Sequence, residues 1–144
     1  MKKIEKSALV SYTPEQMFLL VDDIDSYEIF LPWCSSSKVV ERSADVVKGQ
    51  LDINYSQLHK SFITRNINTP HSQIEMQLVE GPFKHLRGLW LFTPLGTDGC
   101  KIELNMEFEF ASRLVDMTVG PVFGKLANSL VDAFTERAAE VYGK

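Results

Sequence analysis

The C-terminal segment, residues 113–142, repeats apolar residues at the spacing of an amphipathic helix. Gly143 follows the segment directly, and glycine often occurs just past a helix C-terminus. A helix of about 25 to 30 residues is about 40 Å long, at a rise of about 1.5 Å per residue. Such a long apolar stripe needs a large partner surface, which the rest of the chain must supply. The stripe consists of Val119, Phe123, Leu126, Leu130, Phe134, Ala138 and Val141.

Pro121 is an irregularity inside this expected helix, because proline has no N–H to donate to the carbonyl of Met117. Gly120 weakens the helix further. We therefore expect residues 112–119 to form either a separate first turn or a segment bent away from the main helix. Two interpretations stay open: a kink that lets the helix follow a curved sheet, and a movable joint at the mouth of a cavity.

Most of the preceding chain consists of short runs that alternate apolar and polar residues, with turn signals between them. A period of two residues is typical of a strand with one face in the core and the other in water. Strands at this spacing, joined by short turns, predict an antiparallel sheet. The clearest run is the last, residues 101–110, whose inward positions are Ile102, Leu104, Met106, Phe108 and Phe110.

The N-terminal part adds a strand over residues 4–12 and two short helices. Residues 13–16 (Thr-Pro-Glu-Gln) form a capping-box signature that opens the first helix. Residues 25–28 resemble a second capping box, opening a short helix that Pro32 ends. The order of elements is then one strand, two short helices, six strands and a long helix. We predict an α+β fold in one domain, residues 1–144, with a curved antiparallel sheet wrapped around the C-terminal helix.

Composition limits the classes of function. The chain has 144 residues, of which 44% are hydrophobic and 24% charged, as in ordinary globular domains. The net charge of −4 argues against general nucleic-acid binding, so we expect no DNA partner. No apolar run is long enough for a transmembrane segment, although peripheral membrane contact stays open. Met1 leads directly into the strand pattern, and Cys34 and Cys100 stand alone, so a reduced cytoplasmic protein is expected.

The residues that usually carry chemistry do not form a catalytic pattern. The histidines lack metal-ligand spacing, and Cys34 has no identifiable histidine partner, so an inert thiol is expected. Because no acid, base and nucleophile converge, we predict that the protein is not an enzyme. Arg65 lies within a moderately apolar strand, where it is either an exposed strand arginine or an internal partner for a carboxylate or a ligand oxygen.

The run Phe-Leu-Pro-Trp-Cys at residues 30–34 is apolar and aromatic, and Pro32 excludes it from a central strand. Two interpretations stay open for it. The run is a corner that packs Trp33 into the core, or it is a wall or lid of an apolar pocket.

Four stretches carry a resemblance to a known family: residues 30–34, residues 62–65 (Phe-Ile-Thr-Arg), residues 81–86 (Gly-Pro-Phe-Lys-His-Leu) with Gly88 and Trp90, and residues 133–143. They span essentially the whole chain. With them the chain resembles the polyketide cyclase/START-like superfamily, whose shape is called a helix-grip. Within that superfamily it is similar to bacterial ribosome association toxins and to mitochondrial ubiquinone-binding proteins of respiration.

The resemblance implies a cavity between sheet and helix that holds ubiquinone or another isoprenoid lipid in support of respiration, with no cofactor required. A flat quinone head can stack on an indole, and Arg65 or Tyr55 can reach a quinone oxygen if either points inward. The residues expected to contact this ligand are Trp33, Tyr55, Phe62, Arg65, Trp90, Met106, Phe108, Phe123, Leu126, Leu130 and Phe134.

The same resemblance implies an alternative function, in which the protein binds the large ribosomal subunit and blocks subunit joining. That function predicts a surface patch around Lys84, His85 and Arg87, with an interior that is only structural. An enzyme of the cyclase kind ranks third, because the inward positions are almost all apolar. The sequence does not choose between the first two functions.

Overall fold

The computed structural model describes residues 1–55 and 58–143 of the chain. Seven strands precede a pair of C-terminal helices, and short helices follow the first strand. This order matches the order predicted from the sequence. The elements are β1 (Lys2–Val10), α1 (Pro14–Asp22), the 3-10 turn η1 (Ile24–Ser26), α2 (Tyr27–Phe30), β2 (Cys34–Ser43), β3 (Val46–Tyr55), β4 (Leu58–Thr69), β5 (Gln73–Glu80), β6 (Phe83–Leu95), β7 (Gly99–Phe110), α3 (Arg113–Asn128) and α4 (Leu130–Tyr142).

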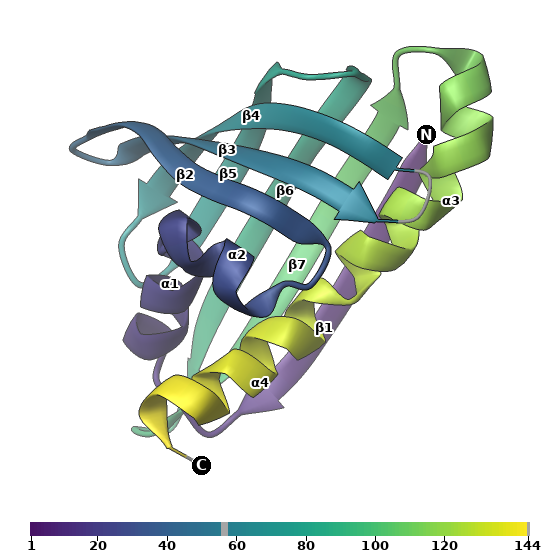
Figure 1. Ribbon diagram of the computed structural model, residues 1–144. Coiled ribbons are helices and arrows are strands. Elements are labelled where there is room, and N and C mark those ends of the chain that lie inside the picture. The colour runs from purple at the N-terminus through teal and green to yellow at the C-terminus, as the bar shows by residue number, and fades with distance from the viewer. Residues whose placement is uncertain (56–57, 144) are drawn as a thin grey trace.

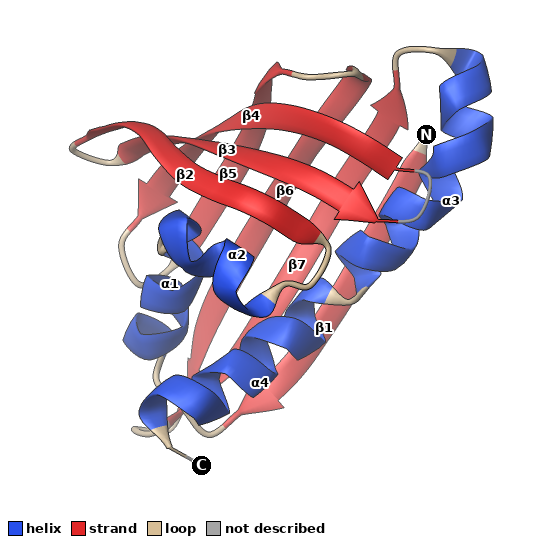
Figure 2. Cartoon of the chain, viewed as in Figure 1, coloured by secondary structure: helices blue, strands red, loops and turns tan. Residues whose placement is uncertain are grey.

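The strands form one antiparallel sheet in the order β1-β7-β6-β5-β4-β3-β2. The sheet curves, and α3 and α4 run along its concave side (Figures 1 and 2). Register shifts between Cys34 and Ser36, between Val39 and Glu41, and between Ile63 and Thr64 interrupt the ladders in the β2–β5 half. Such bulges increase the local twist of a sheet. The predicted α+β helix-grip fold is confirmed.

Strand β7 supplies the centre of the concave face. Its side chains alternate as predicted, because every second one is buried against the helices. Phe108 has 0% exposure, and its ring lies 4.7 Å from the ring of Phe123 on α3. The predicted inward set is fully confirmed: Ile102, Leu104, Met106, Phe108 and Phe110 are all buried.

The long C-terminal helix is interrupted at Ser129, between α3 and α4. The Ser129 hydroxyl donates to the Leu126 carbonyl at 2.7 Å, and the Ser129 N–H donates to the same carbonyl at 3.1 Å. This i to i+3 spacing tightens the chain and shifts the phase of the apolar stripe. As a result Val131 is 0% exposed, whereas Val141 is 48% exposed. The prediction that Val141 belongs to the buried stripe was therefore wrong.

Pro121 lies inside α3, which continues through it. The expectation of a separate first turn before the proline was wrong, since residues on both sides of it are helical. The alternative expectation, a bent segment, agrees with Figure 1, in which the first turns of α3 stand at an angle to the remainder of the C-terminal helices.

The first helix begins as predicted. The Thr13 hydroxyl accepts from the Gln16 N–H, and the Gln16 side chain accepts from the Thr13 N–H, which completes a capping box. The predicted second capping box at residues 25–28 was wrong. There the Glu28 and Asp25 carboxylates instead accept from the backbone N–H groups of two β2 residues, at 2.9 and 2.8 Å. These contacts satisfy donors on an edge strand, where open donors invite pairing with other chains.

Phe134 on α4 packs edge-on against Tyr27, Phe30 and Trp90 and is 1% exposed. We expect Phe134→Ala to lower the free energy of unfolding by about 3 to 5 kcal/mol, because it removes a fully packed ring. Urea denaturation measures this loss. Val141→Ala on the same helix is the control, with an expected change within about 0.5 kcal/mol. A negligible loss for Phe134→Ala would show that the ring is not part of the packed core.

Candidate ligand-binding cavity

A cavity of about 70 Å³ lies between the concave face of the sheet and the C-terminal helices. Strands β3 to β7 contribute Gly49, Leu51, Ile53, Phe62, Thr64, Asn66, Met76, Leu86, Gly88, Trp90 and Met106. The helices contribute Phe123, Leu126, Ala127, Leu130 and Phe134, and the segment between α1 and β2 closes one side with Ile24, Tyr27 and Trp33.

Most of the residues predicted for the ligand site face this cavity. They come from three strands, both C-terminal helices and the corner before β2, so the fold brings together residues that are far apart in the sequence. The predicted residues that line the cavity are Trp33, Phe62, Trp90, Met106, Phe123, Leu126, Leu130 and Phe134.

Three predicted residues lie outside the cavity lining. Tyr55 is at the end of β3 and is 38% exposed. Arg65 donates a hydrogen bond from Nη1 to Oε1 of Gln77 on β5, at 3.3 Å. Phe108 is fully buried against α3 and fills core space instead of facing the cavity.

The alternation of β4 explains the position of Arg65. Successive side chains of a strand point to opposite faces, so Phe62, Thr64 and Asn66 share the inner face and Arg65 takes the outer one. The predicted site included both Phe62 and Arg65, although residues an odd number apart on a regular strand do not share a face. The same rule identifies Thr64 and Asn66 as inner-face residues, and neither was among the predicted site residues.

Thr64 and Asn66 give the cavity a polar spot. The Thr64 hydroxyl donates to Oδ1 of Asn66 at 2.9 Å. Asn66 is only 6% exposed, so its amide is largely removed from bulk water. Burying an amide costs free energy unless the amide is hydrogen-bonded. The pair therefore restricts which ligands the cavity can hold.

Aromatic rings form another part of the cavity wall. The Phe134 ring centroid lies 5.3 Å from Tyr27 and 5.4 Å from Trp90. Trp33 is 7% exposed and lines the cavity, so the corner at residues 30–34 packs into the core and is also a cavity wall. The two interpretations of that corner are therefore both correct.

The cavity is electrically neutral, since none of its lining residues carries a formal charge. The Tyr27 hydroxyl donates to the Val21 carbonyl, and burial, together with Asp22 and Asp23, raises the pKa of Tyr27 above its ordinary value. Burial also raises the pKa of the neighbouring Cys34 thiol, which keeps it in the less reactive protonated form. Within residues 1–55 and 58–143 no group of His, Cys, Asp and Glu is arranged to hold a metal ion.

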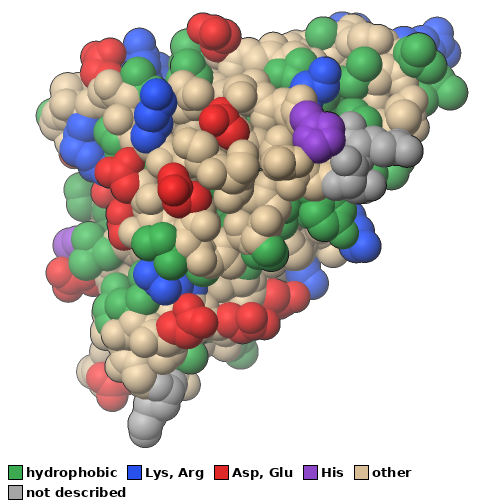
Figure 3. Space-filling view, in the orientation of Figure 1, with side chains coloured by type: hydrophobic (Ala, Val, Ile, Leu, Met, Phe, Trp, Pro, Cys, Tyr) green, Lys and Arg blue, Asp and Glu red, His purple; other side chains and the backbone are tan. Residues whose placement is uncertain are grey.

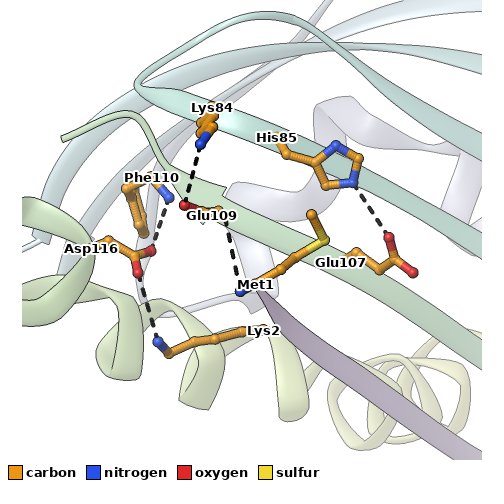
Figure 4. A network of polar contacts seen from close by, with 8 residues as sticks. All are labelled: Met1, Lys2, Lys84, His85, Glu107, Glu109, Phe110 and Asp116. Atoms are coloured by element: carbon orange, nitrogen blue, oxygen red, sulfur yellow. Dashed lines mark hydrogen bonds and ion pairs between the residues drawn. The ribbon is translucent and has the colours of Figure 1, made fainter. Parts of the chain in front are cut away.

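The predicted ribosome-binding patch lies on β6, away from the cavity lining. His85 approaches the Glu107 carboxylate at 3.4 Å, and Lys84 approaches the Glu109 carboxylate at 4.0 Å (Figure 4). Arg87 also approaches the Glu107 carboxylate, at 3.7 Å. The N-terminal amine and Lys3 also lie near these two carboxylates. The positive charge of the patch is therefore partly neutralised by β7.

Basic side chains on the face shown in Figure 3 are scattered. Figure 3 shows Lys and Arg dispersed over one face of the molecule instead of forming one basic area. Among the helices of the described chain, none is both long and apolar enough to cross a lipid bilayer.

A seven-stranded curved sheet around C-terminal helices, with an uncharged cavity between them, agrees with the comparison to known families. A family model described as "Polyketide cyclase / dehydrase and lipid transport" matches residues 10–135. The chain belongs to this family. Its fold is the helix-grip, or START-like, fold, as the resemblance implied.

Members of the polyketide cyclase and lipid-transport family that resemble this chain have different names. The chain is 47% identical to the "Ribosome association toxin RatA" of Vibrio cholerae over 144 residues, which covers all of both chains. It is 29% identical over 150 residues to "Coenzyme Q-binding protein COQ10 homolog B, mitochondrial" of Xenopus laevis, covering 99% of this chain and 61% of that protein. Neither of these two names describes an enzyme.

Solved structures of similar fold include proteins named as enzymes. The Zhui aromatase/cyclase from Streptomyces sp. R1128 superposes with a TM-score of 0.84 over 95% of this chain and 93% of that chain. Its sequence is 14% identical, so the likeness concerns the fold alone.

Proposed function

We propose that this protein is a non-catalytic binding protein for an apolar ligand, an isoprenoid quinone such as ubiquinone or a related lipid, and that it supports respiration. The observation that carries the proposal is the cavity, which is apolar, uncharged and enclosed by the helix-grip. Ligand sites of this kind are concave and mostly apolar with few polar groups. The name of the Xenopus relative supports the quinone as the first ligand to test.

The cavity must widen to take such a ligand. Its volume of about 70 Å³ is well below the roughly 300 to 1,000 Å³ typical of sites for drug-sized ligands. Two features of the wall permit widening. Met76 and Met106 have flexible side chains that adapt to irregular shapes. Ser129 interrupts the helical wall between Ala127 and Leu130, both of which line the cavity, so α3 and α4 have a joint at the site itself.

A second candidate function has its own observation, the 47% identity to a ribosome association toxin along the whole chain. In this function the protein binds the large ribosomal subunit in the cytoplasm and prevents subunit joining. The two functions use different surfaces, the interior for the ligand and the exterior for the ribosome. They are therefore compatible with each other and separable by substitution.

For the ligand function, we expect a short-tailed ubiquinone to quench tryptophan fluorescence saturably and to raise the melting temperature, as a ligand of the native state does. Trp33 and Trp90 both line the cavity, so a bound quinone lies close to each of them. Leu126→Glu is expected to abolish both effects, because it places a charge in the cavity wall.

The matched control for this experiment is Leu114→Glu, which changes a residue on the same helix that is 72% exposed. It is expected to bind quinone like the wild type, and far-UV circular dichroism checks that both variants fold. Quenching that stays linear in quinone concentration, with no thermal shift, would contradict the ligand function.

For the ribosome function, the protein is added to dissociated ribosomal subunits at modest salt. We expect it to reduce the fraction of subunits that join, as measured on a sucrose gradient. Arg87→Glu is expected to weaken this effect, since Arg87 is 64% exposed and available to phosphate. Glu107→Gln is expected to strengthen it, because it removes the carboxylate that partly neutralises the patch.

If Arg87→Glu weakens the effect on subunit joining and Glu107→Gln strengthens it, the β6 patch is the surface that contacts the ribosomal subunit. If both variants reduce subunit joining as much as the wild-type protein does, the contact with the ribosome lies elsewhere on the surface. No loss of joining at several-fold excess of wild-type protein over ribosomes would eliminate the ribosome function.

A further inference from the structure

The polar pair in the cavity is arranged so that one end of the Asn66 amide is occupied and the other is not. The Thr64 hydroxyl and Oδ1 of Asn66 are both oxygens 2.9 Å apart, so the hydroxyl hydrogen must lie between them. In this orientation of the amide, the Nδ2 hydrogens lie on the side away from Thr64. Within residues 1–55 and 58–143 Nδ2 of Asn66 forms no hydrogen bond, and Asn66 as a whole is 6% exposed. Nδ2 itself is not fully closed off, so it keeps some accessible surface.

From this arrangement we propose that Asn66, oriented by Thr64, donates a hydrogen bond to an oxygen acceptor on an uncharged ligand in the cavity. The inference rests on the proposed ligand-binding function and narrows its ligand class. The ligand is a neutral lipid that carries a carbonyl oxygen, as a quinone does, and is neither a plain hydrocarbon nor an anionic lipid.

The row of residues across the sheet beside Asn66 supports this placement. Asn66 pairs with Met76 on β5, Met76 with Gly88 on β6, and Gly88 with Met106 on β7, and all four line the cavity. Neighbouring strands are about 4.8 Å apart, so Gly88 lies about 10 Å from Asn66. This span is sufficient for a flat ring whose oxygen faces the amide.

Gly88 is the surface of the cavity against which that ring can lie, because glycine has no side chain. A Cβ atom added at Gly88 would lie 2.5 Å from Cε of Met76, which covers the glycine in this structure. The Met76 side chain is long and unbranched, so it is displaced at little cost. Displacement of Met76 exposes a floor without a side chain, directly beside a hydrogen-bond donor.

The absence of charged residues from the cavity lining argues against anionic lipids, and the Asn66 donor argues against hydrocarbons. A fatty acid or phospholipid would bring a negative charge into a cavity whose lining has no formal positive charge to pair with it. Burying an unpaired ion is far more costly than burying a neutral carbonyl that accepts a hydrogen bond. A hydrocarbon, in contrast, would leave the Asn66 donor unsatisfied.

The test measures the affinities of three probes by isothermal titration calorimetry, because only the first of them quenches tryptophan fluorescence: a short-tailed ubiquinone, an isoprenoid hydrocarbon of the same tail length, and oleate at neutral pH. Wild-type protein is expected to prefer the quinone. Asn66→Leu is expected to weaken quinone binding about two- to tenfold, the range for loss of one neutral hydrogen bond, and to leave hydrocarbon binding unchanged or tighter.

Thr64 provides the matched variants. Thr64→Ser keeps the hydroxyl and is expected to bind quinone like the wild type, whereas Thr64→Val removes it and is expected to lose part of the preference for quinone. The Thr64 pair also supplies the test if Asn66→Leu does not fold.

Each outcome has a distinct meaning. Equal quinone affinity of the wild type, Asn66→Leu and Thr64→Val would overturn this inference while the cavity still binds ligand. Oleate binding as tight as quinone binding would also overturn it. Failure of the wild-type protein to bind either quinone or hydrocarbon would overturn the proposed ligand function itself.

Discussion

The structure depends on two clusters of aromatic rings that hold the C-terminal helices against the concave face of the sheet. At one end Phe123 packs its ring against Phe108, Phe110 and Phe83, with ring centroids 4.7, 5.7 and 5.2 Å away. At the other end Phe134 packs against Tyr27, Phe30 and Trp90. Between these anchors the wall includes the small residues Ala127 and Gly88, and the space left there is part of the cavity. The cavity is therefore a consequence of how the helices are held.

The same arrangement reconciles a stable fold with a ligand that is larger than the cavity. The Phe123 and Phe134 rings of these aromatic anchors are buried, so each contributes to the stability of the fold. The parts of the wall between them are adaptable, because Met76 and Met106 deform readily and the helical hydrogen bonding is interrupted at Ser129. Widening of the cavity thus requires rearrangement of the middle of the structure and leaves both ends in place.

The sequence predicted the fold well because the fold depends on local periods. The alternation in β7 and the helical stripe from Val119 to Ala138 each report burial directly, so the layers and their facing surfaces followed. The misplacement of Val141 came from the tight turn at Ser129, which no periodicity shows. The second capping box failed because Asp25 and Glu28 form hydrogen bonds with β2, a contact between segments distant in the sequence.

The candidate site was harder to predict than the fold. Its aromatic and aliphatic members followed from the inward positions, but Asn66 was missed and Arg65 was placed on the wrong side of β4. Strict use of strand alternation from Phe62 would have corrected both. The volume of the cavity was not predictable, because it depends on how side chains such as Met76 fill the space over Gly88.

The central claim is that the cavity holds an uncharged lipid with an oxygen acceptor. The most direct test is native mass spectrometry of the protein purified from its host, followed by lipid extraction and identification of the bound molecule. The account predicts a stoichiometric neutral lipid with a carbonyl group, with an isoprenoid quinone as the expected species. Recovery of lipid-free protein, or of anionic phospholipid alone, would contradict it.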